Sequence, residues 1–395
     1  MISIINEEDC CGCAACSAVC PKDCITMEKG SLGHLFPVVD KDKCIACGKC
    51  EKVCPKIEPF YNNGQIKQIV YASYAKDKDI RFSGSSGGIF GIFAEELLDK
   101  GYVVYGAAFD ENLQLKCTKA ETVDELKPLL KSKYLQSDLS KKYHEIKMLL
   151  DNGKKILFVS TPCQVAAIKK YLGKDYSNLI TVDFFCHGVP SQEFFNRCRD
   201  YVEKQRKIVI RSYQFRAKKK HGACPHYFKM EYLKNGSTII DTKLYFHSPF
   251  YLAFQKYINL RESCYECQFA GEKRNSDITI GDFHEIDKYA EGINRFDGVS
   301  TVIINTSVGI QLWNECLEKL NVIEMDLERL KRDKICFNGG TKRPDKRDEF
   351  LKDYSSNSFE SLYDKWMNPK TYRKQEIYYL LPKMIRDQIK KYIGV

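Results

Sequence analysis

Cysteine is the residue type whose number and spacing suggest chemistry in this chain. The 395 residues include 19 cysteines, and ten of them lie at or before Cys54. Eight of these ten form two runs of the same pattern, C-x2-C-x2-C-x3-C-P. Closely spaced thiolates of this kind bind iron–sulfur clusters or zinc. The two runs are Cys10, Cys13, Cys16 and Cys20, and Cys44, Cys47, Cys50 and Cys54.

The repeated pattern is the one found in bacterial ferredoxins with two [4Fe–4S] clusters, where the fourth cysteine of each run ligates the other cluster. The first cluster would be held by Cys10, Cys13, Cys16 and Cys54. The second cluster would be held by Cys44, Cys47, Cys50 and Cys20. Zinc is the alternative, but zinc modules seldom use this spacing and have no need of it twice. Cys11 and Cys24 fall outside the pattern, and we expect them to be packed or bystander thiols.

Composition excludes several classes of protein. Apolar residues make up 44% and charged residues 29% of the chain, as in ordinary globular proteins. The first ten residues lack the basic and apolar regions of an export signal, and there is no apolar run of membrane-spanning length. We therefore expect a cytoplasmic protein whose cysteines serve metal or redox chemistry rather than disulfides. The net charge of +10 says little about partners, and no nucleic-acid-binding pattern is present.

Alternating strands and helices are expected to position these residues. A polar stretch after Pro59 separates the cysteine-rich head from the rest, and a β-hairpin is expected between the two cysteine runs. The pattern of the rest predicts an α/β body with a mixed sheet behind an N-terminal bacterial-type two-cluster ferredoxin domain. The expected strands are 69–75, 103–109, 156–160, 179–185, 277–283 and 300–305, and the expected helices are 89–101, 165–173 and 192–205.

A second group of cysteines lies in the body. Cys163 follows one expected strand and Cys186 follows the next, so both lie at one edge of the sheet if these strands are parallel. Cys264 and Cys267 form a further pair before the strand 277–283. These four would complete another four-thiolate site, with Cys224 as a rival fourth ligand. The alternative is that the first two are small buried residues and the pair binds zinc or nothing.

The glycine-rich loop Ser83–Gly88 lies between a strand and the start of a helix. Free backbone N–H groups and the positive helix end favour a phosphate at such a place. The loop matches neither the Rossmann nor the Walker pattern, so an ordinary tight turn is the favoured interpretation of the loop alone.

Six sequence blocks together resemble the beta-subunit family of coenzyme F420-reducing hydrogenase and formate dehydrogenase, in the form with a fused two-cluster ferredoxin head. The blocks follow one another in the family's order between residues 70 and 340. They are SGSSGGIF (83–90), KSKYLQS (131–137), STPCQVAA (160–167), FFCHGVPS (184–191), SCYECQF (263–269) and SDITIGDF (276–283).

The resemblance implies an FAD in the body beside a body [4Fe–4S] cluster, with a deazaflavin that exchanges hydride with the FAD. The implied ligands of this third cluster are Cys163, Cys186, Cys264 and Cys267. The segments implied near FAD contain Ser83, Gly84, Ser85, Ser86, Gly87, Gly88 and Lys133, with Asp282 at the same sheet edge. His187 follows an implied ligand, where it would tune the cluster or relay a proton as a catalytic residue, or be a structural histidine.

We therefore expect an iron–sulfur flavoprotein oxidoreductase that moves electrons between a small-molecule hydride donor and a partner protein. The donor would be reduced coenzyme F420, a reduced nicotinamide or another flavin. One alternative is a ferredoxin-fed reductase of a metabolite such as a cell-surface polysaccharide precursor. The other is an electron-transfer subunit without a substrate of its own.

The expected organisation has four parts. They are a ferredoxin domain at 1–60, two parts of the flavoprotein body at 68–160 and 161–345, and a basic segment at 346–395. In the last part Leu381, Ile385 and Ile389 lie on one face of a helix that starts at Pro382, with lysines elsewhere. A basic amphipathic helix is typical of a membrane-surface or partner contact, and packing on its own domain is the alternative.

Overall fold

The computed structural model describes residues 2, 6–57, 65–218, 227–332, 337, 339–372, 374, 377–378, 381, 385 and 388. Contacts divide the chain into two units. The first unit comprises residues 1–192 and 260–342, and the second comprises residues 193–259 and 343–395. The four-part organisation expected from the sequence stays a prediction.

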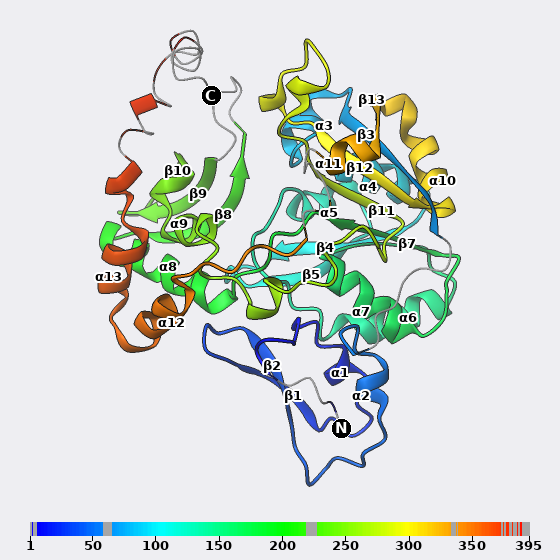
Figure 1. Cartoon of the computed structure of the whole chain (residues 1–395), viewed down its shortest axis with the longest axis horizontal. Helices are drawn as coiled ribbons and strands as arrows, with labels where there is room; N and C mark the ends of the chain where they lie inside the picture. Colours follow the sequence, from blue (N-terminus) through cyan, green and yellow to red (C-terminus); the bar gives the residue numbers. More distant parts are fainter. Residues whose placement is uncertain are drawn as a thin grey trace. The chain divides into compact units, whose positions relative to one another are not determined.

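Thirteen strands are found in the described residues (Figure 1). They are β1 Ile25–Lys29, β2 Leu35–Val39, β3 Gln65–Ala75, β4 Val103–Phe109, β5 Leu115–Ala120, β6 Ile156–Val159, β7 Leu179–Phe184, β8 Val209–Ala217, β9 Tyr227–Lys234, β10 Ser237–Leu244, β11 Ile278–Asp282, β12 Ser300–Thr306 and β13 Leu320–Met325. All six strands expected from the sequence are confirmed, with ends that differ by a few residues.

The same described residues contain thirteen α-helices. They are α1 Ala15–Ala18, α2 Lys49–Lys52, α3 Lys78–Ser83, α4 Ile89–Asp99, α5 Val123–Leu126, α6 Lys142–Asp151, α7 Pro162–Leu172, α8 Gln192–Arg206, α9 Pro249–Gln255, α10 Ser307–Cys316, α11 Leu327–Arg332, α12 Arg347–Ser356 and α13 Phe359–Leu362. The three expected helices correspond to α4, α7 and α8.

The head is built twice from the same short elements. Each cysteine run ends in one helical turn, α1 in the first run and α2 in the second, and the two turns contact each other. Between the runs, β1 and β2 form the expected antiparallel hairpin. The head belongs to the first unit, where α1 also contacts α6 and α7 of the body.

The body of the first unit is one eight-stranded mixed sheet in the order β13-β3-β12-β11-β7-β6-β4-β5. Strands β11, β7, β6 and β4 are parallel to one another, and the remaining pairs are antiparallel. This arrangement confirms the α/β body with a mixed sheet. It also places the ends of β6, β7 and β11 at one edge, as expected for Cys163 and Cys186.

Helices cover both faces of this sheet because side chains alternate along each strand. On β6, Leu157 packs with α4 and α10, whereas Ile156 and Phe158 pack with α6 and α7. The second of these layers also contains Cys11 and Cys13 of the head. The first cysteine run is therefore part of the body's hydrophobic core.

The second unit combines the antiparallel sheet β10-β9-β8 with α9, α12, α13 and nearly all of α8. Its core is aromatic: Phe195 lies with its ring centroid 5.2 Å from Tyr213 and 5.7 Å from Phe250. Arg347, which is 2% exposed, donates to the carbonyl oxygen of Ile258 inside this unit.

The expected C-terminal amphipathic helix cannot be traced through the described residues. Pro382 and Ile389 lie outside them, and Ile385 is helical and 38% exposed. Among the helices of the described residues, none has the length and apolar character needed to cross a membrane.

Candidate functional site

The first head site is formed where the first cysteine run meets the last cysteine of the second. Burial raises the pKa of Cys16 to about 12, and negative charge on the nearby Cys10 and Cys54 adds to this effect. Cys10 is in turn influenced by Cys54. Three of the four predicted ligands therefore lie together. The fourth, Cys13, is buried and lies near Cys11.

The second head site is a cavity of about 360 Å³ with four predicted ligands in its wall. They are Cys20, Cys44, Cys47 and Cys50. Cys24 also lines this cavity, with its Sγ atom 3.3 Å from that of Cys20. The sequence did not single out Cys24, because it stands outside the repeated pattern.

The body cysteines line one cavity of about 520 Å³. Cys163 lies in the first turn of α7, Cys186 follows β7, and Cys264 and Cys267 lie at and after the 3₁₀ turn Glu262–Cys264. The Oγ1 atom of Thr161, the N-cap of α7, is 3.3 Å from the Cys163 sulfur. The structure thus brings together four thiols that are up to about a hundred residues apart in the sequence.

Burial and the nearness of the other thiols raise the pKa values of cysteines in the body cavity. Burial raises the pKa of Cys264 to about 12, with Cys163 and Cys267 adding to the shift. Burial also raises the pKa of Cys186, and Cys264, Cys163 and Cys267 reinforce it. Four half-buried thiolates close together repel one another unless a cation lies between them, so this donor set fits an iron–sulfur cluster, which needs four thiolates.

No three histidine, cysteine or acidic side chains in the described part of the chain are arranged to hold a single metal ion. Cys224, the rival fourth ligand, lies outside the described residues.

Two head residues reach the body cavity. Cys11 and Lys56 line it together with the four body cysteines. Cys11 is 9% exposed, and its thiol lies near that of Cys163. The spacing of the run predicts only a packed or bystander thiol at this position. The structure shows Cys11 to be packed, and places it in the wall of a site.

The backbone of the first cysteine loop is held by body side chains. The Cys10 carbonyl oxygen accepts hydrogen bonds from Arg261 Nη1 (3.1 Å) and Ser263 Oγ (2.9 Å). The Cys11 carbonyl oxygen accepts one from Gln136 Nε2 (2.7 Å). These contacts were not predicted from the sequence, because the partners are backbone atoms of a distant loop.

The loop Ser83–Gly88 is tied to its own chain. The Ser85 hydroxyl accepts a hydrogen bond from the Ser132 backbone N–H (2.7 Å), and the Ser86 hydroxyl donates to the Val299 carbonyl oxygen (2.5 Å). The Gly87 N–H donates to Ser300 Oγ (3.0 Å). At its end, Gly88 is the N-cap of α4 and has φ +83°. It provides no side-chain cap, so no capping side chain accepts from the backbone N–H groups of the first turn of α4.

Lys133 lies beside this loop. Its Nζ atom donates to the carbonyl oxygens of Pro128 and Leu130, each at 2.7 Å. Burial lowers the pKa of Lys133 to about 7, and the charge of Lys131 contributes in the same direction. The loop and Lys133 are close to each other as expected, since Ser132 links them. Neither lines the two cavities described above.

His187 and Asp282 lie near each other at the edge of the sheet. His187 is exposed, and its carbonyl oxygen accepts a hydrogen bond from Thr341 Oγ1 (2.6 Å). Loss of water from part of the ring lowers the pKa of His187, while Asp282 opposes this change. Asp282 also stands 3.7 Å from Nε2 of His284.

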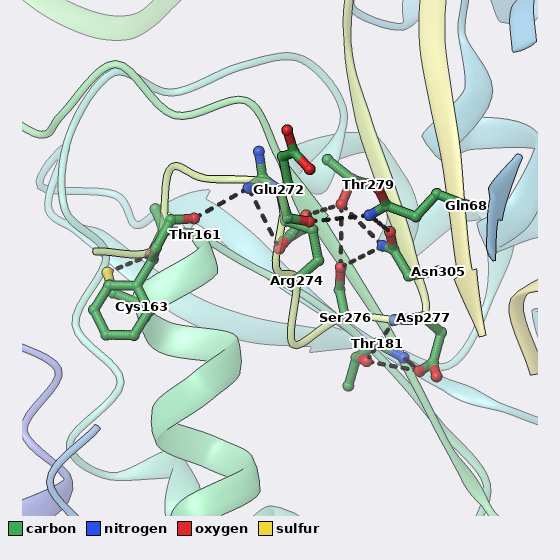
Figure 2. Close-up of polar contacts among 12 residues, drawn as sticks. Gln68, Thr161, Cys163, Thr181, Glu272, Arg274, Ser276, Asp277, Thr279 and Asn305 are labelled. Atoms are coloured by element: carbon green, nitrogen blue, oxygen red, sulfur yellow. Dashed lines mark hydrogen bonds and ion pairs between the residues drawn. The ribbon is translucent and has the colours of Figure 1, made fainter. Parts of the chain in front are cut away.

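Buried polar side chains form a network next to this edge of the sheet (Figure 2). Arg274 points toward Thr161, and its Nη1 atom lies 3.8 Å from Oδ2 of Asp183. Both side chains are almost completely buried. Burial raises the pKa of Asp183, and Arg274 and the Thr279 hydroxyl oppose it. The network joins β7 and β11, and β7 is followed by Cys186, which lines the cavity.

Comparison with known proteins gives two matches over the chain. Residues 153–329 match the family model for the C terminus of the beta subunit of coenzyme F420 hydrogenase/dehydrogenase. Residues 36–62 match a 4Fe-4S binding domain. No curated protein matches the chain.

One solved structure is similar in part. A chain of the F420-reducing [NiFe] hydrogenase complex from Methanosarcina barkeri shares 17% identity, with a TM-score of 0.44. The similarity covers 73% of this chain and 98% of that chain.

The beta-subunit match contains all four body cysteines, together with Arg261 and Asp282. The 4Fe-4S match contains the second cysteine run, whereas the first run lies outside it. Ser83–Gly88 and Lys133 also lie outside both matches. The chain is thus an iron–sulfur protein related to an oxidoreductase subunit.

Proposed function

We propose that the chain is an iron–sulfur flavoprotein oxidoreductase that moves electrons between a small-molecule hydride donor and a partner protein. The observation that carries the proposal is the body cavity, where Cys163, Cys186, Cys264 and Cys267 surround one space and a head residue joins them. Reduced coenzyme F420 is the proposed hydride donor, because the beta-subunit family is named for that coenzyme.

The residues have the following proposed roles. The eight cysteines of the two runs would hold two [4Fe–4S] clusters, and the four body cysteines would hold a third. A bound flavin would supply the exchange between two-electron hydride transfer and single-electron transfer. The chain would limit the access of water to the half-buried body cysteines, and exposed His187 would exchange protons with solvent.

The FAD site is supported by the loop Ser83–Gly88. Its hydroxyl groups are already bonded within the chain, so the group left for a phosphate is the uncapped start of α4. Lys133 would add a positive charge next to this point when protonated. Asp282 is the remaining residue proposed to lie near the FAD, at the end of β11.

The test is a count of cofactors in protein purified without oxygen. Three clusters predict about twelve iron atoms per chain, and the proposal also requires extractable flavin. The Cys264→Ser variant is expected to lose about four iron atoms, because it removes a ligand of the body site. Cys316→Ala is the matched control, because Cys316 is a buried cysteine on α10 outside the three sites.

Each result has a clear meaning. About eight iron atoms in the unaltered chain, or an unchanged count in Cys264→Ser, would contradict the body cluster. Iron for three clusters without flavin would instead support an electron-transfer subunit that has no hydride chemistry of its own.

A further inference from the structure

The two cysteine loops of the head have the same backbone geometry. The third residue of each loop has a positive φ, +66° at Gly12 and +52° at Ala46. The fifth residue does too, +64° at Ala14 and +72° at Gly48. The two loops are therefore structural equivalents, as their spacing suggests. Each residue of the first loop has a counterpart in the second.

Equivalent positions in the two loops have opposite surroundings. Cys11 is 9% exposed and lines the body cavity, whereas its counterpart Ile45 is 58% exposed. Cys13 is buried, whereas its counterpart Cys47 is exposed. The first loop faces the body and the second loop faces solvent.

Neighbouring residues of the first loop belong to two sites. Cys10 lies with Cys16 and Cys54 in the first head site, and Cys11 lines the body cavity beside Cys163. Their Cα atoms are about 3.8 Å apart because one trans peptide joins them. A single peptide unit therefore separates the two groups of thiols.

Arg261 is a buried positive charge at this junction. It is 1% exposed, and its Nη1 atom donates to the Cys10 carbonyl oxygen. Its Nη2 atom donates to the Leu35 carbonyl oxygen (2.9 Å), and Nε donates to Gln136 Oε1 (2.9 Å). The guanidinium is thus fixed in orientation by both head and body.

Arg261 contacts a predicted ligand of each site. Its carbonyl oxygen accepts a hydrogen bond from the Cys264 N–H (3.0 Å), and its Nη1 atom donates to the Cys10 carbonyl oxygen (3.1 Å). One fixed positive charge therefore lies between the first head site and the body cavity.

We propose that Arg261 is a positioning residue that couples the first head site to the body cavity, so that the first head site, and not the second, exchanges electrons with the body. This inference rests on the proposed function. Each transfer moves one electron, so one site is oxidised as the other is reduced, and no bond forms or breaks. The electrons come from the hydride donor or from a reduced protein carrier that meets the outward-facing second site.

The physical consequence of Arg261 is a shift in reduction potential. A reduced cluster carries one more negative charge than an oxidised one, so a nearby fixed cation favours reduction. Removing this charge is expected to make the potentials of the first head cluster and the body cluster more negative. The potential of the second head cluster is expected to stay unchanged, because Arg261 contacts the first cysteine loop.

The experiment is a redox titration of the full chain, loaded without oxygen and followed by electron paramagnetic resonance. Arg261→Gln removes the charge, whereas Arg261→Lys keeps the charge and loses the planar guanidinium group. Signals are assigned with Cys264→Ser for the body cluster and Cys47→Ser for the second head cluster. The expected result is a negative shift of two signals in Arg261→Gln that Arg261→Lys largely restores.

A second measurement does not depend on substituting Arg261. In the fully reduced chain, the signal of the first head cluster is expected to show magnetic broadening from the body cluster. Loss of the body cluster in Cys264→Ser should narrow that signal, and loss of the second head cluster in Cys47→Ser should leave the body signal unchanged. The opposite pattern would overturn the inference even if Arg261→Gln does not fold.

The iron count separates the two proposals. About eight iron atoms in the unaltered chain would overturn the body cluster and this inference together. About twelve iron atoms with unshifted potentials in Arg261→Gln, or with a shift only in the second head cluster, would overturn the role of Arg261 and leave the proposed function standing.

Discussion

A side chain at Gly12 would have no room, because the guanidinium of Arg261 occupies the space that a Cβ atom would need. A Cβ atom built at Gly12 would lie 2.3 Å from Nη2 of Arg261, and Gly12 has φ +66°. Gly48 has a similar φ of +72° with nothing within 4 Å. The two glycines therefore both have a positive φ, and they differ in what surrounds them.

This difference predicts unequal effects of the same substitution. Gly12→Ala is expected to displace Arg261 and the first cysteine loop, with a loss of about four iron atoms per chain. Gly48→Ala is expected to keep its iron, at a backbone cost of about 1 kcal/mol, because Ala14 already occupies the equivalent conformation. Iron and sulfide analysis of both variants tests this prediction, and equal iron contents would contradict it.

At the scale of elements, the cavity depends on the order of strands in the sheet. Cys163 and Cys186 follow β6 and β7, which are parallel neighbours. The other pair precedes β11, which pairs with β7 although 93 residues separate the two strands. Asp277, just before β11, joins these elements: its carboxylate accepts from the Thr181 N–H (2.8 Å), the Thr181 hydroxyl (2.7 Å) and the Thr306 hydroxyl (2.8 Å).

We therefore expect Asp277→Ala to destabilise the first unit. Three buried donors would lose their acceptor, which should lower the free energy of unfolding by about 3 kcal/mol or more. Asp326→Ala is the control, because Asp326 accepts a hydrogen bond from the Arg329 N–H at the start of α11 and its loss should cost about 1 kcal/mol. Thermal unfolding of the loaded variants measures the difference, and similar midpoints would show that Asp277 does not hold the strands together.

At the scale of the whole molecule, the two loops of the head face different surroundings. The first loop is part of the body's core, and the second exposes Ile45 beside Cys44. An exposed apolar side chain next to a redox site is suited to contact with a protein electron carrier. The second loop is therefore the place where we expect the partner protein to bind.

Ile45→Glu tests this expectation. It should slow reduction by a protein electron carrier about tenfold, because a charge in an apolar contact must be desolvated, and it should leave iron content and reduction by dithionite unchanged. Ile240→Glu is the control, since Ile240 is 60% exposed on β10 in the second unit. Equal rates for the two variants in stopped-flow measurements would place the partner elsewhere.

The sequence by itself determined the local features of this protein. The spacing of the two runs predicted the repeated loops, and the alternation of strands and helices predicted the mixed sheet, because both depend on residues close together in the chain. Tertiary structure alone decided that β11 pairs with β7, which brings the four body cysteines together. It also decided that Cys11 faces the body while Ile45 faces solvent. Spacing is the same in both loops, and the packing of the first loop against Arg261 and Gln136 sets their surroundings apart.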